Sequence, residues 1–306
     1  MNAPMAFFVG IDGGGTQTTC VVGDELRVLG SASAAGCNIV RLGEEEARRN
    51  LQTAIQRACA VARISPAQVT NACVGVAGIS ATGVRDQLRA IIGELVPGTI
   101  TVVGDMDIAL EAAFGGGPGV IVIAGTGSVA LGRGPDGQTA RVGGWGYAIS
   151  DEGSGHWIGR ELVRRALRAW DDAHAAMLPS FVREVWRTQT AEEVVRIANA
   201  TPPPDYAALF PSVLKSANEG DAAARAILED AATELATMAR EVIGHIWGDR
   251  ALPVPVAVTG GVFSKSEIVR DRFFSILGGW EIARPVCEVV QPALGALALA
   301  RQGARE

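Results

Sequence analysis

The 306-residue sequence is unusually poor in lysine, with only Lys215 and Lys265. A Walker A loop needs a lysine directly after a glycine, and neither lysine follows one, so that class of nucleotide-binding loop is excluded. The formal net charge of −6 also lacks the basic footprint of a nucleic-acid-binding protein. No nucleic-acid partner is therefore expected.

The cysteines are few and scattered, and none forms a C-x-x-C pair; the five are Cys20, Cys37, Cys59, Cys73 and Cys287. This spacing excludes a cysteine metal site and argues against a disulfide framework. No apolar run is long enough to span a membrane, and the opening MNAPMAFFVG lacks the basic segment of a secretory signal. A cytoplasmic location without membrane partners is the expectation.

What is present is an ordinary globular composition, with 48% hydrophobic and 20% charged residues over a length that suffices for two domains. The first half alternates short apolar runs with helical patterns in the order β-β-β-α-β-α-β-α, which is typical of a mixed α/β domain. The expected strands are 7–11, 18–22, 27–34, 72–77 and 100–104, and the expected helices are 44–62, 82–95 and 108–114.

A flexible GGGPG stretch at 115–119 predicts a domain boundary. Residues 1–115, completed by the C-terminal helix 292–306, form one expected domain, and 116–291 form the other, with a helical insertion. The second domain opens with a strand, a glycine turn and another strand, as the first does. This indicates a weak internal duplication, with two unrelated hairpins as the alternative. Helices are expected over 155–172, 180–186, 191–199, 206–218, 221–247 and 265–277, and strands over 254–258 and 280–283.

Three glycine turns each follow an apolar strand: GGGT at 13–16, GTGS at 125–128 and TGG at 259–261. Such turns offer backbone N–H donors and room for the close approach of a phosphate. A single turn of this kind is as well explained by a tight hairpin. Three of them, each carrying a hydroxyl residue, favour phosphate binding.

The first turn is not a dinucleotide fingerprint, because GGGT is followed by QTTCVV, a β-branched run, where that motif opens a helix. Asp12 stands at the entry to this turn. A carboxylate beside a phosphate turn suits Mg²⁺, which favours few carboxylates and retained waters. Asp12 is therefore predicted to hold Mg²⁺, either directly or through water, and the alternative is an aspartate that caps the turn.

The motifs IDGGGT, AGTGS and GGWGYAISDEGSG, with Asp105 between the first two and TGGVF and PALGA near the end, resemble the sugar-kinase/Hsp70/actin superfamily. The sequence is most similar to the N-acetylglucosamine kinase and glucosamine kinase branch of the BadF/BadG/BcrA/BcrD ATPases. The resemblance implies two actin-like or ribonuclease H-like α/β domains, each with a mixed β-sheet flanked by helices, and an active-site cleft between them. It also implies ATP and Mg²⁺ as cofactors and, in many relatives, a homodimer.

The resemblance assigns roles by position. Gly13, Gly14, Gly15 and Thr16 would hold phosphates together with Gly125, Thr126 and Gly127, and Gly260 and Gly261 would lie against the nucleotide. The positions that match sugar contacts are Asn38, Gly78, Ser128, Gly144, Trp145, Gly146 and Asp151, and Asp105 matches the catalytic base.

The residues themselves are consistent with a base at Asp105, because phosphoryl transfer to a hydroxyl needs a proton acceptor where a strand ends in the site. The alternative is that Asp105 caps the helix expected from Ile108. Asp107 is better placed for capping, since it stands immediately before the apolar run of that helix.

The expected activity is ATP-dependent phosphorylation of the 6-hydroxyl of N-acetylglucosamine. Glucosamine is the alternative, because GGWG resembles kinases of acetylated sugars whereas GCNIVRLG and SDEGSG are also close to glucosamine kinases. Two further alternatives are the activator ATPase of 2-hydroxyacyl-CoA dehydratases and a non-catalytic sugar or nucleotide sensor. The first needs cysteines clustered for an iron–sulfur centre, which are lacking, and the second need not retain Asp105.

Overall fold

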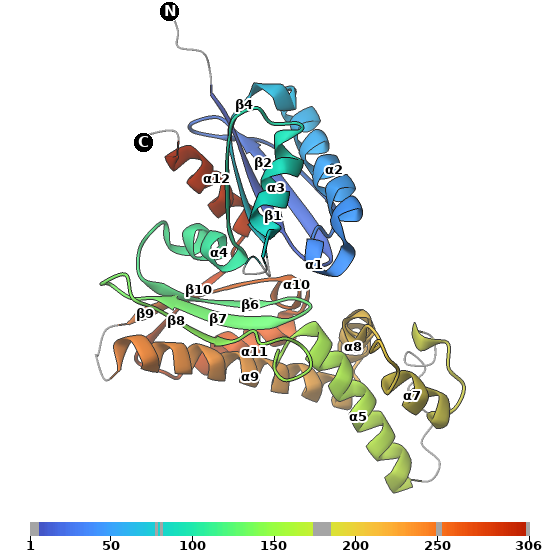
Figure 1. Cartoon of the computed structure of the whole chain (residues 1–306). Helices are drawn as coiled ribbons and strands as arrows, with labels where there is room; N and C mark the ends of the chain where they lie inside the picture. The colour runs from blue at the N-terminus through green and yellow to red at the C-terminus, as the bar shows by residue number, and fades with distance from the viewer. Residues whose placement is uncertain (1–5, 77–78, 80–81, 174–184, 249–252, 304–306) are drawn as a thin grey trace, which may run out of the picture. The chain divides into compact units, whose positions relative to one another are not determined.

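The computed structural model describes residues 6–76, 79, 82–173, 185–248 and 253–303 (Figure 1). The chain divides into two compact units. Unit 1 comprises Met1–Pro118 and Val290–Glu306, and unit 2 comprises Gly119–Val289. Among the described residues, none of the helices combines the length and the apolar character needed to cross a membrane.

Unit 1 is built on a five-stranded mixed sheet in the order β3-β2-β1-β4-β5. The central strand β1 pairs antiparallel with β2 and parallel with β4, which in turn pairs parallel with β5. The parallel strands β1, β4 and β5 therefore end at the same edge of the sheet. The strands are β1 (Phe7–Gly13), β2 (Gln17–Gly23), β3 (Val28–Ala35), β4 (Val69–Val76) and β5 (Thr99–Gly104).

Helices cover both faces of this sheet, α2 and α3 on one and α4 and α12 on the other (Figure 1). Helix α2 starts with three glutamates, which favour the positive end of the helix dipole, and buries Leu51 and Ile55. The helical segments are α1 (Ile39–Leu42), α2 (Glu44–Ala62), the 3₁₀ turn η1 (Pro66–Gln68), α3 (Val84–Gly93), α4 (Asp105–Phe114) and α12 (Pro292–Gln302).

Close backbone contact holds the C-terminal helix α12 in unit 1. A Cβ on Gly295 would lie 2.0 Å from the carbonyl oxygen of Ile108 and 2.6 Å from the amide nitrogen of Ala112, both in α4. We expect Gly295→Ala to lower the free energy of unfolding by about 3 kcal/mol, at the upper end of overpacking effects, because backbone cannot move aside as a side chain can. Urea unfolding followed by circular dichroism measures this.

The matched control is Gly244→Ala in the long helix of unit 2, where nothing lies within 4 Å of the added methyl group. That substitution is expected to stabilise the protein by roughly 0.5–1 kcal/mol, because alanine is the better helix former. Equal effects of the two substitutions would show that α12 does not depend on the glycine contact.

Unit 2 repeats the same sheet, in the order β10-β9-β6-β7-β8. Its first strand β6 pairs antiparallel with β7 and parallel with β9, just as β1 pairs with β2 and β4. Both sheets are thus a three-stranded meander extended by two parallel strands, which confirms the predicted fold class and supports the internal duplication. The strands are β6 (Gly119–Ala124), β7 (Ser128–Arg133), β8 (Thr139–Gly143), β9 (Val254–Thr259) and β10 (Ala283–Val289).

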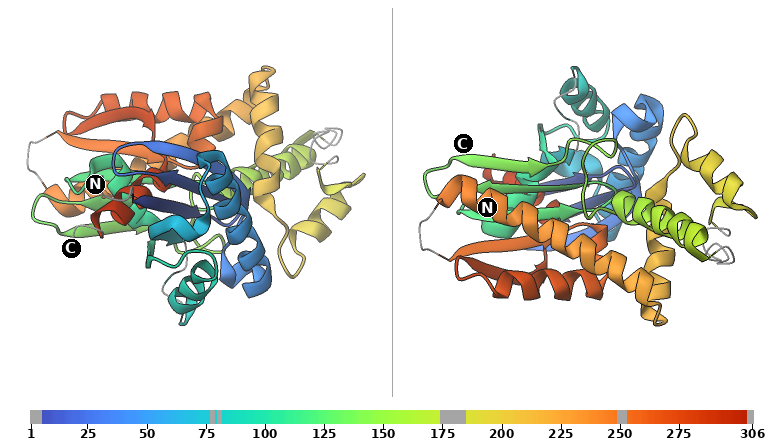
Figure 2. Two further views of the ribbon diagram at one scale, coloured as in Figure 1. Left: turned by 90° about the horizontal axis from the view of Figure 1, so that it is seen from above. Right: turned by 90° about the horizontal axis from the view of Figure 1, so that it is seen from below.

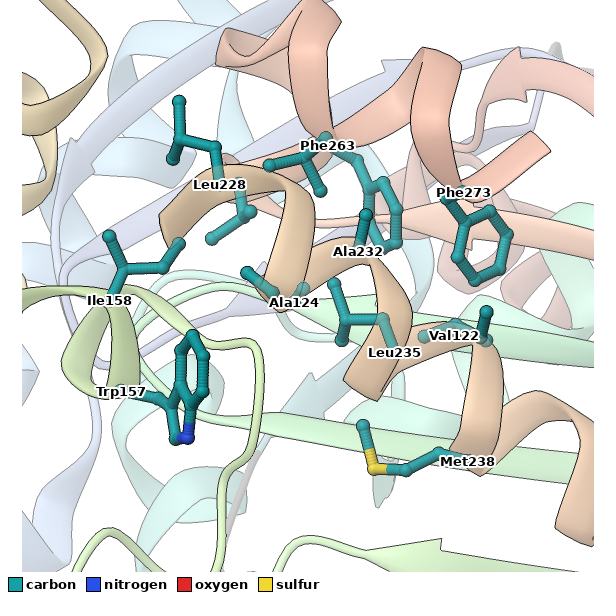
Figure 3. Packing of buried hydrophobic residues seen from close by; sticks show 14 of the residues in the cluster. Val122, Ala124, Trp157, Ile158, Leu228, Ala232, Leu235, Met238, Phe263 and Phe273 are labelled. Carbon is teal, nitrogen blue, oxygen red and sulfur yellow. The ribbon is translucent and has the colours of Figure 1, made fainter. Parts of the chain in front are cut away.

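The core of unit 2 forms between its sheet and the 26-residue helix α9, with α11 packed beside α9 (Figure 2). Leu228, Ala232 and Leu235 of α9 lie near Val122 and Ala124 of β6 in this core (Figure 3). The helical segments are α5 (Gly155–Ala173), α7 (Ala191–Ala198), η2 (Tyr206–Leu209), α8 (Phe210–Asn218), α9 (Ala222–Trp247), α10 (Gly261–Lys265) and α11 (Glu267–Gly278).

Three expectations about individual elements need correction. The last strand is Ala283–Val289 and not 280–283, because the amide of Trp280 still bonds to Leu277 in the turn that ends α11. Helix α4 begins at Asp105, three residues before the expected start. The segment 206–218 is a 3₁₀ turn followed by a helix. Most of the helix expected over 180–186 lies outside the described residues.

Candidate active site

Two aspartates lie at the edge of unit 1 where its parallel strands end. Asp12 on β1 is in register with Gly75 on β4, and Val76 is in register with Gly104 on β5, after which Asp105 begins α4. Glycine at position 75 places no side chain on the strand between the two acids. The register thus brings together the residue predicted to hold the metal and the residue predicted to act as base.

Burial and nearby carboxylates raise the pKa of both aspartates. Burial, together with the charge of Asp105, raises the pKa of Asp12 to about 6. Burial also raises the pKa of Asp105, and the amide of Met106, which donates to its Oδ1 at 3.0 Å, opposes that shift. Ionising both carboxylates costs free energy because their negative charges lie near each other, and a bound cation would offset that cost.

Asp107 caps helix α4 from the third position of its first turn, and not from the position before the helix that the sequence suggested. Its Oδ2 accepts the amide hydrogen of Gly104 at 3.0 Å, which satisfies a donor at the start of the helix. This bond also explains why α4 starts before Ile108. Asp105 is therefore not needed as the cap of α4. Its role as the proton acceptor stays a prediction, supported by its position at the edge where the parallel strands end.

The GGGT turn is held by the loop that carries Asn38. The amide of Gly14 donates to Gln17 and that of Cys37 donates to Gly14, at 3.0 and 3.1 Å. Asn38 caps the one-turn helix α1, with its Oδ1 accepting the amide of Arg41 at 3.2 Å. The predicted sugar-binding asparagine and the predicted phosphate turn therefore lie side by side in unit 1.

In unit 2 the structure brings the two remaining glycine turns together. Ile123 and Thr259 are in register at the ends of the parallel strands β6 and β9. Gly260 has φ of +102°, and a Cβ there would lie 2.3 Å from the carbonyl oxygen of Ala124. Only glycine fits this position. Gly125, Thr126, Gly127, Gly260 and Gly261 thus gather at one edge of the sheet.

The start of α5 is bound to the turn after β6. The amide of Gly155 donates to the carbonyl of Gly125 at 2.8 Å, and that of His156 donates to Thr126 at 3.2 Å. The buried His156 is packed between the rings of Tyr147 and Tyr206, with centroids 5.0 Å away in each case. Burial lowers the pKa of His156, and the charge of Arg160 lowers it further.

Asp151 connects the phosphate turn to the GGWG loop, a role that the sequence did not reveal. The backbone amides of Ser128 and Gly146 hydrogen-bond its carboxylate, and a Cβ on Gly127 would lie 2.8 Å from its Oδ2. Burial nevertheless raises its pKa. The hydroxyl of Ser128 donates to the carbonyl of Glu152 at 2.7 Å. Contacts of Asp151 and Ser128 with a sugar stay predictions, and both residues are structural supports.

The loop after β8 exposes apolar side chains. Trp145 is 68% exposed, Tyr147 48% and Ile149 80%, and the guanidinium carbon of Arg141 lies 4.2 Å from the Trp145 ring centroid. Glycines 144 and 146 on either side of Trp145 have φ of +71° and +98°. Large exposed apolar side chains so close together indicate a binding surface.

Four observations complete the comparison with the sequence. Gly78, a predicted sugar contact, lies outside the described residues. Arg41 was overlooked, although it is the only basic residue in GCNIVRLG. The four cysteines of unit 1 are buried and unbridged, and Cys287 is exposed. Within the described ranges no three acidic, histidine or cysteine side chains group as metal ligands.

The site residues fit ATP and Mg²⁺. In unit 1, the GGGT turn gives a phosphate close access to backbone, and the Asp12–Asp105 pair provides the small number of carboxylates that Mg²⁺ uses when phosphate oxygens complete its ligands. In unit 2, the turns at 125–128 and 259–261 offer a phosphate the same kind of backbone. Asp12 is the residue that would hold the metal.

The two sheets, each with a glycine turn after its first strand, match the actin-like fold of solved sugar kinases. A solved structure from Chromobacterium violaceum, assigned to an N-acetylglucosamine kinase, matches with a TM-score of 0.74 and 25% identity, over 97% of this chain and 99% of that one. Residues 9–300 match the BadF/BadG/BcrA/BcrD ATPase family, and the chain belongs to that family.

Two characterised relatives align over nearly their whole length. The N-acetylmuramic acid/N-acetylglucosamine kinase of Clostridium acetobutylicum is 29% identical over 97% of this chain and 99% of its own. The glucosamine kinase of Vibrio cholerae is 30% identical over 95% of both chains. Both relatives phosphorylate amino sugars or their derivatives, as their names state.

Proposed function

We propose that the protein is an ATP-dependent kinase that phosphorylates the 6-hydroxyl of N-acetylglucosamine. The observation that carries the proposal is the pair of half-buried aspartates beside the GGGT turn, at the edge where β1, β4 and β5 end. Family membership and the amino-sugar kinases among the relatives support it. A homodimer remains a prediction.

In the proposed reaction, Asp105 accepts the proton of the sugar 6-hydroxyl as that oxygen bonds to the γ-phosphorus. The bond from this phosphorus to the bridging oxygen breaks, and ADP leaves with the electron pair. The turns Gly13–Thr16 of unit 1 and Gly125–Gly127 of unit 2 are the segments proposed to hold the phosphates. The amides of Gly14 and Gly125 already bond within these turns, to Gln17 and Gly127, so other amides would be the donors. Gly260 and Gly261 leave room for the nucleotide.

Asp12 would hold Mg²⁺, whose charge stabilises the negative charge that develops on the transferred phosphoryl group. Asp12 must be ionised for this. Because burial and the charge of Asp105 raise its pKa to about 6, we expect the site to take up Mg²⁺ best above about pH 6. Asn38, at the turn beside these acids, is the proposed sugar contact in unit 1.

The loop that carries Trp145 favours an acetylated sugar. A free 2-amino group is cationic and needs a carboxylate partner, whereas an acetamide needs an apolar wall. The Asp151 carboxylate already accepts backbone amides, while Trp145, Tyr147 and Ile149 are exposed. Glucosamine remains the alternative, because a glucosamine kinase is among the relatives.

A coupled ADP-release assay tests the proposal over N-acetylglucosamine, glucosamine, N-acetylmannosamine, N-acetylmuramic acid and glucose. We expect kcat/KM for N-acetylglucosamine to exceed that for glucosamine by at least about tenfold, the scale of one small group in a pocket. Trp145→Ala should reduce this preference, whereas Trp170→Ala on α5 should leave it unchanged.

Three outcomes would contradict the proposal. If the enzyme prefers glucosamine, the proposed substrate would be the sugar with a free amine and not the acetylated sugar. Absence of ADP release with every sugar would eliminate kinase activity in favour of a sensor. The visible absorbance of an iron–sulfur cluster in the purified protein would favour the dehydratase-activator alternative.

A further inference from the structure

Arg41 is a cation beside the phosphate turn that the roles described so far do not use. Its Nη1 lies 3.6 Å from the position that a Cβ on Gly15 would occupy, so the guanidinium group is next to the GGGT turn. We propose that Arg41 binds the γ-phosphate of ATP. This inference rests on the proposed kinase function and adds a residue to it.

The backbone around Arg41 fixes its position. Helix α1 is a single turn, and its start is held by the Asn38 side chain, which accepts the Arg41 amide at 3.2 Å. The preceding loop packs on the turn itself, since a Cβ on Gly36 would lie 2.3 Å from the carbonyl oxygen of Gly15. Arg41 is therefore attached to the glycine turn through short, close-packed backbone.

The charge balance of unit 1 calls for such a cation. The turn that would receive a phosphate lies near two half-buried acids, Asp12 and Asp105, and both would repel an anion. Neither lysine of the protein belongs to unit 1. Arginine in place of lysine offers a planar group that binds two phosphate oxygens at once.

Other arginines of unit 1 make their described contacts away from the GGGT turn. Arg48 pairs with Glu44 and Glu94, Arg85 donates to the carbonyl of Val102, and Arg301 donates to the carbonyl of Asp24. Arg41 is thus the cation that the described contacts place against the turn.

The position of the base indicates which phosphate Arg41 meets. Asp105 must reach the hydroxyl that attacks the γ-phosphorus, and it lies at the same strand edge as the turn. The phosphate nearest this edge is therefore the γ-phosphate. When the bond to the bridging oxygen breaks and the sugar oxygen bonds to phosphorus, Arg41 would stabilise the charge on the equatorial oxygens.

The test compares Arg41→Ala and Arg41→Lys with Arg89→Ala, an exposed arginine that pairs with Asp86 on α3. The cap of α1 uses the backbone amide of residue 41, so it survives these substitutions, and thermal melts check the fold. Calorimetric titration with a non-hydrolysable ATP analogue and with ADP gives a readout that does not depend on turnover.

We expect Arg41→Ala to weaken binding of the ATP analogue roughly 10- to 100-fold, the scale of a charge-assisted hydrogen bond, and to change ADP binding less than twofold. The kcat/KM for ATP should fall roughly 100-fold. Arg41→Lys should recover part of both losses, and Arg89→Ala should behave as wild type.

Equal binding of the ATP analogue by Arg41→Ala and wild type would overturn the inference. A loss confined to N-acetylmuramic acid would also overturn it, because Arg41 would then bind the sugar's carboxylate. If wild type releases no ADP with any sugar, the kinase proposal fails, and the comparison of ATP analogue with ADP still decides the role of Arg41.

Discussion

Replacing Asp105 with asparagine is expected to lower kcat by about 10⁴-fold, the upper range for removal of a general base. Asparagine retains an oxygen for the amide of Met106, which donates to Asp105 at 3.0 Å, so the start of α4 stays intact. It cannot take the proton of a sugar hydroxyl. Steady-state assay of ADP release measures the loss, and calorimetry should show that the sugar still binds within a few-fold of wild type.

Asp107→Asn is the matched control, two residues along the same helix. Asp107 accepts the amide of Gly104 at 3.0 Å, and asparagine keeps a side-chain oxygen that can accept the same bond. We expect kcat to remain within a few-fold of wild type and the free energy of unfolding to change by less than about 1 kcal/mol.

The pair of variants separates the two roles sharply. Near-full activity of Asp105→Asn would show that the base assignment is wrong. A comparable loss in Asp107→Asn would move the base to that residue, or show that the start of α4 must be held rigidly for turnover.

Much of the fold was predictable because its signals are local. The glycine turns after apolar strands at Gly13 and Gly125 defined both hairpins, and the three glutamates at 44–46 marked the start of α2. The edge strand β10 was missed because Arg284, Pro285 and Glu288 interrupt its apolar pattern. An edge strand tolerates these residues, since one side has no partner.

The contacts that build the site were less predictable because they join residues that are distant in the sequence. The sequence suggested Asp12 and Asp105 separately. Only the register of β1, β4 and β5 shows that both lie at one sheet edge, where the charge of Asp105 raises the pKa of Asp12. The sequence predicted that Asp151 contacts the sugar or favours the start of a helix, whereas its carboxylate accepts the backbone amides of Ser128 and Gly146. Arg41 was indistinguishable from an ordinary surface arginine until Gly15 was placed beside it.

Replacing Asp12 with asparagine is expected to stabilise the metal-free protein while removing its activity. Burial and the charge of Asp105 raise the pKa of Asp12 from 3.8 to about 6, so the folded protein holds this proton more tightly than the unfolded chain. Between about pH 4 and 6, stability therefore falls as pH rises, and above pH 6 the whole cost is present. Two pKa units correspond to about 3 kcal/mol.

In EDTA at pH 7.5, Asp12→Asn should therefore unfold at a higher urea concentration than wild type, and this difference should largely disappear at pH 4.5. Mg²⁺ should stabilise wild type by pairing with the ionised carboxylate and should have little effect on the variant. Turnover should fall about 10³-fold, which corresponds to the several kcal/mol that a metal ion supplies to the transition state.

Asp86→Asn serves as the control, because the Asp86 side chain is 86% exposed and pairs only with the neighbouring Arg89 among its described ion pairs. It should leave both the Mg²⁺ effect and turnover unchanged. If Asp12→Asn fails to stabilise the metal-free protein, Asp12 is not a strained carboxylate. If it retains the Mg²⁺ effect, the ion binds elsewhere. Gain of stability together with loss of turnover is the signature of a carboxylate kept ionised for function at a structural cost.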